Sequence, residues 1–217
     1  MKPIIDIVFP CLDEAAALPW VLARIPVGAR AIVVDNGSLD GSPDIARELG
    51  ADVVHCRQRG YGAACHGGLM AASAELVAFC DCDASVHPGD ALRLADVLLA
   101  GADLVVARRR PTTRGAWPLA ARLANRELAR RVRRRTGVHV DDVGPLRVAR
   151  RIELQALGLT DRRSGYPVET IVAAARAGWR IAQVDVDYTP RIGKSKVTGT
   201  VRGSMQAVRD MSGALAR

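Results

Sequence analysis

The chain alternates short, continuously apolar runs with stretches of helical periodicity, and this alternation limits the folds open to it. The apolar runs lie at residues 4–9, 31–34, 53–55, 76–80 and 104–107, and helical patterns separate them at 18–24, 42–49, 63–72 and 88–100. Continuous apolar strands, unlike strands that alternate apolar and polar residues, indicate a sheet buried on both faces. We therefore predict an α/β fold with a mostly parallel, Rossmann-like sheet and helices on both faces.

Acidic side chains follow three of these apolar runs. Asp13 and Glu14 come after the first, Asp35 after the second, and Asp81 and Asp83 after the fourth. Ligands of open parallel sheets bind beyond the carboxyl ends of the strands, so we expect these side chains to line one crevice. Neighbouring carboxylates repel one another and are costly to bury unpaired, and a divalent cation would offset that cost. Mg²⁺ and Mn²⁺ prefer such oxygen ligands and can bridge to a diphosphate.

The D-x-D spacing alone is a weak signal, because the chain contains it twice. We interpret Asp185-Val186-Asp187 as structural, since it lies inside the expected strand at 182–188. Asp81-Cys82-Asp83 is favoured as the metal site by its position after a buried strand. The five cysteines include no C-x-x-C pair and the four histidines show no zinc spacing, so we expect reduced packing thiols and no zinc catalysis.

Positive charge is concentrated in one segment. Residues 108–135 contain eleven arginines and one acid, Glu127, which gives +10 in a chain whose net charge is +8 and leaves −2 for the remainder. Ten net charges in so short a segment exceed what an ordinary solvated face carries. Polyanion binding, to a membrane or a nucleic acid, would account for this segment but not for acidic clusters at three strand ends.

A helix is expected across residues 117–133, with its apolar and basic residues on opposite sides. The apolar side gathers Trp117, Leu119, Ala120, Leu123, Ala124 and Leu128, and the basic side Arg122, Arg126, Arg130 and Arg133. This is the composition of an interfacial membrane helix, although an ordinary helix packed on the sheet would also fit. No apolar stretch reaches the roughly 18–20 residues needed to span a bilayer. We expect a cytoplasmic protein peripherally associated with the inner face of the membrane.

Six segments, in order along nearly the whole chain, resemble motifs of family 2 inverting glycosyltransferases of the GT-A fold. The first four, at residues 10–14 (PCLDE), 33–42 (VVDNGSLDGS), 59–64 and 79–85 (FCDCDAS), resemble the family's nucleotide-sugar-binding half. The last two, at residues 141–151 and 166–196, resemble the dolichol-phosphate mannosyltransferase-like branch. The resemblance implies one GT-A domain over residues 1–217, with a donor half at 1–110 and an acceptor half at 111–217 that includes the basic helix at 117–135.

The chain departs from the family pattern at several positions. Asn36 stands where a second aspartate is usual, Ser85 where many relatives have glutamine, and residues 144–146 read Gly-Pro-Leu where Ser-Gly-Phe is usual. The Q-x-x-R-W motif of processive synthases is absent, which disfavours polymer synthesis.

The resemblance assigns donor-binding roles to residues of the first half. Pro10, Glu14 and Asp35 would hold the nucleoside, because carboxylates accept hydrogen bonds from base N–H groups and ribose hydroxyls. Gly60 and Gly62 would let the backbone pass close to the donor, or would simply begin a helix. The metal would be bound by Asp81 and Asp83, with Ser85 as a further ligand.

Three cations of the second half are candidates for binding phosphates. These are Arg147, Arg191 and Lys196, and the hydroxyl of Ser195 lies beside the last of them. Guanidinium groups suit phosphate oxygens because their N–H donors form a planar fork.

Three carboxylates of the second half have roles that depend on the acceptor. For a hydroxyl acceptor, Asp141 or Asp142 would be the general base, whereas a phosphate acceptor is already anionic and needs none. The two would then orient the sugar or the metal. Glu169 would bind sugar hydroxyls or favour the helix dipole.

Together these features predict a metal-dependent inverting glycosyltransferase that moves a hexose from a UDP- or GDP-linked sugar to a polyprenyl phosphate, with Mg²⁺ or Mn²⁺ as cofactor. A transferase acting on a soluble hydroxyl acceptor is the main alternative. A sugar-phosphate nucleotidyltransferase is less favoured, because its Gly-rich loop would stand where this chain reads PCLDE. A non-enzymatic polyanion- or membrane-binding protein leaves the acidic clusters unexplained, and no specific nucleic-acid partner is expected.

Overall fold

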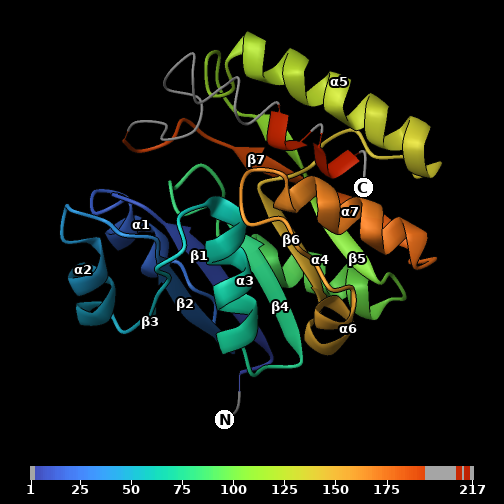
Figure 1. Cartoon of the computed structure of the whole chain (residues 1–217). Helices are drawn as coiled ribbons and strands as arrows, with labels where there is room; N and C mark the ends of the chain where they lie inside the picture. The colour runs from blue at the N-terminus through green and yellow to red at the C-terminus, as the bar shows by residue number, and fades with distance from the viewer. Residues whose placement is uncertain (1–2, 194–208, 212, 216–217) are drawn as a thin grey trace.

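The fold is built on one seven-stranded sheet, and a computed structural model describes residues 3–193, 209–211 and 213–215. The strand order is β3-β2-β1-β4-β6-β5-β7 (Figure 1). The strands are β1 (Ile5–Cys11), β2 (Ala29–Asp35), β3 (Asp52–His55), β4 (Leu76–Cys80), β5 (Leu104–Pro111), β6 (Leu146–Arg150) and β7 (Ile181–Tyr188). Among these strands β6 alone is antiparallel to its neighbours. The predicted mostly parallel α/β sheet is confirmed.

Helices cover both faces of the sheet. They are α1 (Leu18–Leu22), α2 (Ser42–Glu48), α3 (Tyr61–Ala71), α4 (Asp90–Leu99), α5 (Leu119–Thr136), α6 (Arg151–Ala156) and α7 (Tyr166–Arg176). On one side, Ile7 of β1 packs in a core with residues of α1, α2 and α4. On the other side, Val8 packs in a second core with residues of α3, α5, α6 and α7. Neighbouring residues of one strand thus enter different cores, which is why its sequence is continuously apolar.

Strand β6 was not predicted. Its sequence, LRVAR, contains two arginines and so lacks the continuous apolar character of the other central strands. Arg147 is nevertheless only 1% exposed, because β6 lies between β4 and β5 and has its backbone bonded on both sides.

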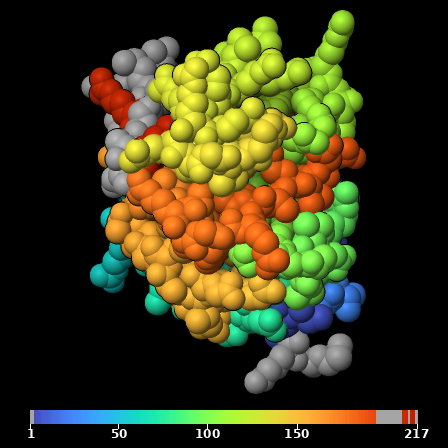
Figure 2. All heavy atoms as spheres, turned by 90° about the vertical axis from the view of Figure 1, so that its right-hand side faces the viewer, coloured from blue at the N-terminus to red at the C-terminus, as the bar shows by residue number. Residues whose placement is uncertain are grey.

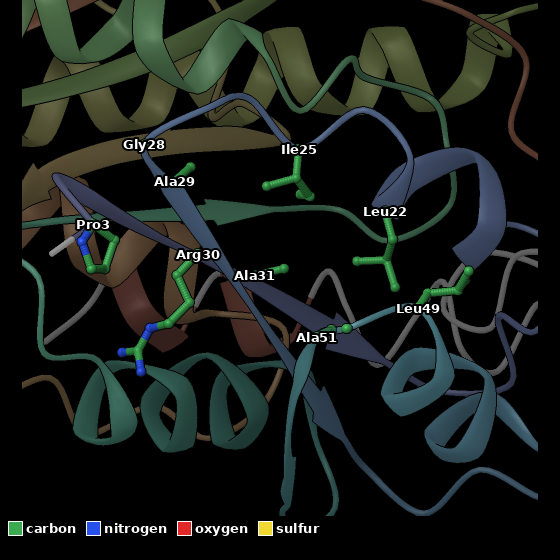
Figure 3. Close-up of a pocket in the computed structure, with 10 residues that line it drawn as sticks. Pro3, Leu22, Ile25, Gly28, Ala29, Arg30, Ala31, Leu49 and Ala51 are labelled. Carbon is green, nitrogen blue, oxygen red and sulfur yellow. The ribbon is translucent and has the colours of Figure 1, made fainter. Parts of the chain in front are cut away.

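A surface cavity of about 550 Å³ opens at the amino ends of β2 and β3, beside Arg30 (Figure 3). Leu22 and Ile25, at the end of α1 and beyond it, and Leu49, which follows α2, contribute apolar side chains to its wall. The acidic residues of interest follow the carboxyl ends of the strands, so this cavity lies at the opposite end of the sheet.

Asp6 ties several segments together at the amino end of the sheet. Its fully buried carboxylate accepts hydrogen bonds from Arg30 Nε and Nη2, both at 2.8 Å, and from the backbone N–H groups of Ser73 and Ala74 at 2.6 and 2.8 Å. Burial raises the pKa of Asp6, but the bonds from Arg30, Ala74 and Ser73 outweigh burial and place the pKa below its ordinary value. The ionised form is therefore the one that the fold stabilises.

We expect Asp6→Asn to lower the free energy of unfolding at neutral pH by about 2 kcal/mol, because hydrogen bonds to a charged group are lost. The folded-state pKa is lowered, so this contribution is present above the unfolded pKa of about 4 and is lost as the pH falls through the folded value. Urea denaturation at several pH values measures it. Asp52→Asn is the control, because Asp52 also bonds Arg30 but its side chain is 58% exposed, and we expect it to cost less than about 1 kcal/mol. An undiminished difference for Asp6→Asn in acid would contradict this account.

Candidate active site

The sheet brings the three predicted acidic segments to one edge. β1 lies between β2 and β4 and is parallel to both, and Cys11 at its end pairs with Asp35 at the end of β2. Glu14 follows β1 and Asp83 follows β4. All three carboxylates are buried, with 8%, 5% and 7% of Glu14, Asp35 and Asp83 exposed. Such a group of buried carboxylates needs compensating positive charge or hydrogen-bond donors.

Arg191 supplies part of this compensation. Its Nη2 lies 3.2 Å from Glu14 Oε1 and 3.3 Å from Asp83 Oδ2. The backbone near Arg191 is bound to the D-x-D turn, because Ile192 N donates to Asp83 O at 2.9 Å and Thr189 N donates to Ser85 O at 3.0 Å. The guanidinium group therefore lies between the ends of β1 and β4, and its role in phosphate binding stays a prediction.

The turn that follows β4 fixes the orientation of Asp83. Ser85 donates to Asp83 Oδ1 from its backbone N at 3.0 Å and from its hydroxyl at 2.5 Å. Ala84 between them has φ +62°, a left-handed conformation that non-glycine residues adopt at a cost. Ser85 is fully buried, so in this structure its hydroxyl orients Asp83. Its predicted role as a direct metal ligand remains a prediction.

Asp81, the first carboxylate of the D-x-D, is held by a chain of partly buried hydrogen bonds. Tyr61 donates its hydroxyl hydrogen to Asp81 Oδ1 at 3.1 Å, and Arg147 Nη2 donates to the Tyr61 oxygen at 3.4 Å. Burial raises the pKa of Asp81 to about 6, and the negative charge of Asp83 adds to this effect. Arg147, predicted to bind phosphate, is 1% exposed and also donates from Nη1 to Gly144 O at 3.0 Å. Tyr61 was not singled out from the sequence, although an aromatic residue between Gly60 and Gly62 could have indicated a functional position.

The residues present fit a divalent cation that shares its coordination with a ligand. Within the described part of the chain no three acidic, histidine or cysteine side chains form a complete metal cage. Mg²⁺, however, is commonly bound by one or two carboxylates together with substrate phosphates. Asp81 and Asp83 supply two carboxylates, and burial together with the negative charge of Asp83 raises the pKa of Asp81, a cost that a bound cation would reduce.

Asp35 and Asn36 organise the neighbouring loops. Asp35 accepts from Ser38 N at 2.9 Å and lies 3.3 Å from His55 Nδ1. Burial raises its pKa, but the Ser38 and His55 hydrogen bonds bring the pKa below its ordinary value. Asn36 donates to the carbonyls of Cys56 and Gln58 and accepts from Gly60 N. An aspartate could not donate two such bonds, which explains the asparagine at this position.

Gly60 and Gly62 lie against another backbone segment of the protein. A Cβ on Gly60 would come within 2.1 Å of Arg162 O, and one on Gly62 within 2.7 Å of Asp161 O. Gly62 N and Ala63 N donate to the carbonyls of Arg163 and Arg162, so these carbonyls satisfy the first N–H groups of α3. Glycine at both positions thus lets the backbone of residues 161–163 pack against the start of α3. The predicted close approach of these glycines to a donor is not tested and stays a prediction.

Both carboxylates proposed as a general base are bound to arginines. Asp142 is 1% exposed and accepts from Arg109 N, Nε and Nη2 at 2.9, 2.9 and 2.6 Å, and from Gly144 N at 2.9 Å. Asp141 is more exposed and pairs with Arg108 at 3.0 Å and with Arg133 at 3.1 Å.

Arg109, which sequence reasoning did not single out, links β5 to α5. Beyond Asp142, its guanidinium donates to Asn125 Oδ1 at 3.1 Å and lies 4.1 Å from the centre of the Trp117 ring and 5.5 Å from that of Tyr188. In the sequence it is one member of an arginine run, so no pattern distinguished it from Arg108 and Arg110.

The remaining predicted residues lie in different surroundings. Glu169, in the first turn of α7, accepts from Thr160 N and Oγ1 and from Asp161 N, which fixes the preceding loop. Pro10 lies within β1, next to the edge that carries Glu14. Ser195 and Lys196 fall outside the described residues.

The chain is similar to a known family and to known proteins. The family model described as glycosyl transferase family 2 matches residues 6–157. An uncharacterized glycosyltransferase of Mycobacterium tuberculosis is 49% identical over 95% of both chains. The dolichyl-phosphate hexose transferase of Haloferax volcanii is 32% identical over 88% of this chain and 85% of its own length.

A solved structure shares the fold and has ligands bound. Glucosyl-3-phosphoglycerate synthase from M. tuberculosis, in complex with Mn²⁺ and UDP-glucose, matches with a TM-score of 0.79 and 25% identity. The match covers 98% of this chain and 78% of that one.

We expect Asp81→Asn to stabilise the metal-free protein at about pH 8 by about 1–2 kcal/mol, because the buried charge is removed. The folded-state pKa of about 6 lies above the unfolded value, so Asp81 contributes stability at low pH that is lost as the pH rises through that pKa. Urea denaturation in a chelating buffer measures the gain, which should vanish below about pH 4. The exposed Asp44→Asn is the control and should change stability little at either pH. An equal gain for Asp81→Asn at both pH values would refute the assignment.

Proposed function

This chain belongs to glycosyl transferase family 2 and is a glycosyltransferase, and we propose that it moves a hexose from a UDP- or GDP-linked donor to a polyprenyl phosphate with inversion at the sugar. The observation that carries the proposal is the joint placement of Glu14, Asp83 and Arg191 at the carboxyl edge of a GT-A sheet. Glu14 is suited to bind a nucleoside and Asp83 to bind a metal, and Arg191 between them is suited to bind a diphosphate.

In the proposed reaction an oxygen of the acceptor phosphate attacks the anomeric carbon from the side opposite the nucleoside diphosphate. The bond from that carbon to the diphosphate oxygen breaks as the new bond forms, which inverts the configuration. Glu14 and Asp35 accept hydrogen bonds from the nucleoside, and Arg191 neutralises charge on the departing diphosphate. A divalent cation held by Asp81 and Asp83 would supply further charge neutralisation on the same group.

The surroundings of Asp141 and Asp142 support a phosphate acceptor. Both oxygens of Asp142 already accept hydrogen bonds from Arg109, and Asp141 lies between Arg108 and Arg133. Neither is placed as a free proton acceptor, and an anionic phosphate needs none. The relative from H. volcanii, which is named for transfer to dolichyl phosphate, supports the same choice.

A hydroxyl acceptor is the second candidate. The solved structure with UDP-glucose bound is that of an enzyme named for a glucosylated 3-phosphoglycerate, and 3-phosphoglycerate is a small phosphorylated acceptor. Incubating the protein with Mn²⁺, a panel of UDP- and GDP-sugars, and either a polyprenyl phosphate or 3-phosphoglycerate discriminates between the two. Product on the lipid phosphate alone supports the proposal, and product on 3-phosphoglycerate alone overturns it.

We expect Asp83→Asn to lower kcat/KM by about a hundredfold or more, because several kcal/mol of charge stabilisation on the leaving group depends on this carboxylate. Binding of Mn²⁺ in the presence of the nucleoside diphosphate, followed by electron paramagnetic resonance, should weaken in parallel. Asp185→Asn is the matched control, because it alters the second D-x-D, which pairs with Arg108 and Arg110. Equal losses in both variants, or none in Asp83→Asn, would exclude this metal site.

We expect Asp141→Asn to leave kcat for transfer to polyprenyl phosphate within about threefold of wild type, since no general base is required. Loss of a general base commonly costs about a hundredfold or more, so a fall of that size would favour a hydroxyl acceptor. Initial rates at saturating donor measure the difference, and a thermal melt verifies that the variant is folded.

A further inference from the structure

Helix α5 leaves most of its circumference open to solvent. Its inward side consists of Asn125, Ala129 and Val132, which are buried, and Leu128, which packs against the core beside α7. Figure 2 shows the atoms of α5, in yellow, at the outer end of the molecule beyond those of α7. Among the described residues no helix is both long and apolar enough to cross a membrane.

The outward side of α5 has an apolar part and a basic part. The apolar part lies in the first two turns, where Leu119 is 70% exposed, Leu123 is 57% exposed, and Ala120 and Ala124 beside them are also exposed. Residues four apart lie on one face of a helix, so the two leucines form a ridge. The rest of the exposed surface is basic and comprises Arg122, Arg126, Arg130, Arg131, Arg133, Arg134 and Arg135. We call these two parts together the α5 outer face.

The α5 outer face differs from the apolar stripe expected from the sequence. Trp117 does not belong to it, because its ring is stacked on Arg109. Leu128 does not belong to it either, because it packs inward. The four remaining residues of that stripe are exposed, so the helix is anchored by a different set of side chains.

Most of the positive charge on the α5 outer face is uncompensated. Helix α5 carries seven arginines and one acid, Glu127, which pairs with Arg130 and Arg131. Arg122, Arg126, Arg134 and Arg135 form no ion pair within the described residues. Arginines in the last turn would favour the helix dipole, but Arg122 and Arg126 lie in the first half, where a cation is not favoured in this way.

We propose that the α5 outer face docks on an anionic lipid bilayer. Leu119 and Leu123 would enter the boundary between headgroups and acyl chains, and the arginines would contact lipid phosphates. Charge complementarity favours this occupant, because a second copy of the same face would repel its partner. A nucleic acid would engage the arginines but leave the leucine ridge without a role.

The position of α5 relative to the site agrees with such docking. The helix begins eight residues after β5 ends at Pro111, and its Asn125 accepts a hydrogen bond from Arg109 in the last part of β5. Figure 1 shows α5 beyond α7 and β7. The D-x-D turn follows the carboxyl end of β4, at the same end of the sheet. Docking through α5 would therefore bring that end toward the lipid surface. The inference rests on the proposed function only in that a polyprenyl phosphate acceptor resides in a membrane.

The test is flotation of the full chain, without donor or acceptor, with vesicles of phosphatidylcholine alone or mixed equally with phosphatidylglycerol. We expect binding to the anionic vesicles only, weakened by added salt. The double variant Leu119→Ser/Leu123→Ser should bind at least about tenfold more weakly, and Arg126→Gln/Arg134→Gln should weaken binding to a similar degree. The control Val27→Ser/Ile152→Ser also removes two exposed apolar side chains, 92% and 63% exposed, outside α5 and should bind like wild type.

The proposal is overturned if no vesicle is bound, if neutral and anionic vesicles bind equally, or if the leucine variant binds like wild type. Concentration-dependent self-association that the leucine substitutions abolish would instead identify a second copy as the occupant. Thermal melts verify that each variant is folded. Vesicle binding without sugar transfer would refute the proposed function alone, and transfer to a detergent-dispersed acceptor without vesicle binding would refute the docking surface alone.

Discussion

The guanidinium group of Arg191 bridges Glu14 and Asp83, and the carboxyl edge of the sheet depends on this contact. Three parallel strands end side by side there, so their acidic residues converge without any long-range loop. Convergence of buried carboxylates costs free energy, and one shared cation with hydrogen bonds from Ser85 offsets part of that cost. Because Arg191 follows the last strand of the sheet, the contact also joins the two halves of the chain across the site.

A second arginine, Arg109, serves the acceptor half in a similar way. It donates hydrogen bonds to Asp142 and to Asn125 of α5, and it stacks on the ring of Trp117. These contacts join the end of β5, helix α5 and the 141–144 segment. Such a buried ion pair is weak support for stability by itself, but it fixes relative orientation. The basic helix is therefore joined to the strand edge that carries the site, and is not an independent appendage.

The parallel strands and the place of the acidic residues that follow them could be predicted from the sequence, because buried parallel strands are continuously apolar and polar residues mark where they end. The antiparallel strand β6 lacks that signature. Side-chain partners did not follow from the sequence. Arg147 has the guanidinium group of a phosphate ligand. Its strand β6 lies between β4 and β5, however, and the side chain donates to the hydroxyl of Tyr61. Gly60 and Gly62 match a donor-binding motif, yet a segment a hundred residues later occupies the space they leave. On α5, periodicity placed the apolar residues together but could not determine that Asn125 and Ala129 would face inward.

The two D-x-D sequences show what spacing cannot decide. Asp185 lies within β7, where strand pairing places it opposite Arg108, and it contacts both Arg108 and Arg110. Hydrogen bonds from Arg108 and Arg110 outweigh burial and leave the pKa of Asp185 below its ordinary value, whereas burial raises the pKa of Asp81 to about 6. Inside a strand, the aspartate Asp185 of one D-x-D is thus neutralised by two arginines of the protein. Beyond the end of a strand, the negative charge of Asp81 in the other D-x-D is less well compensated. A chain that retains incompletely compensated carboxylates beside Arg191 forgoes stability there, and the proposed binding of a cation with a nucleotide would restore it.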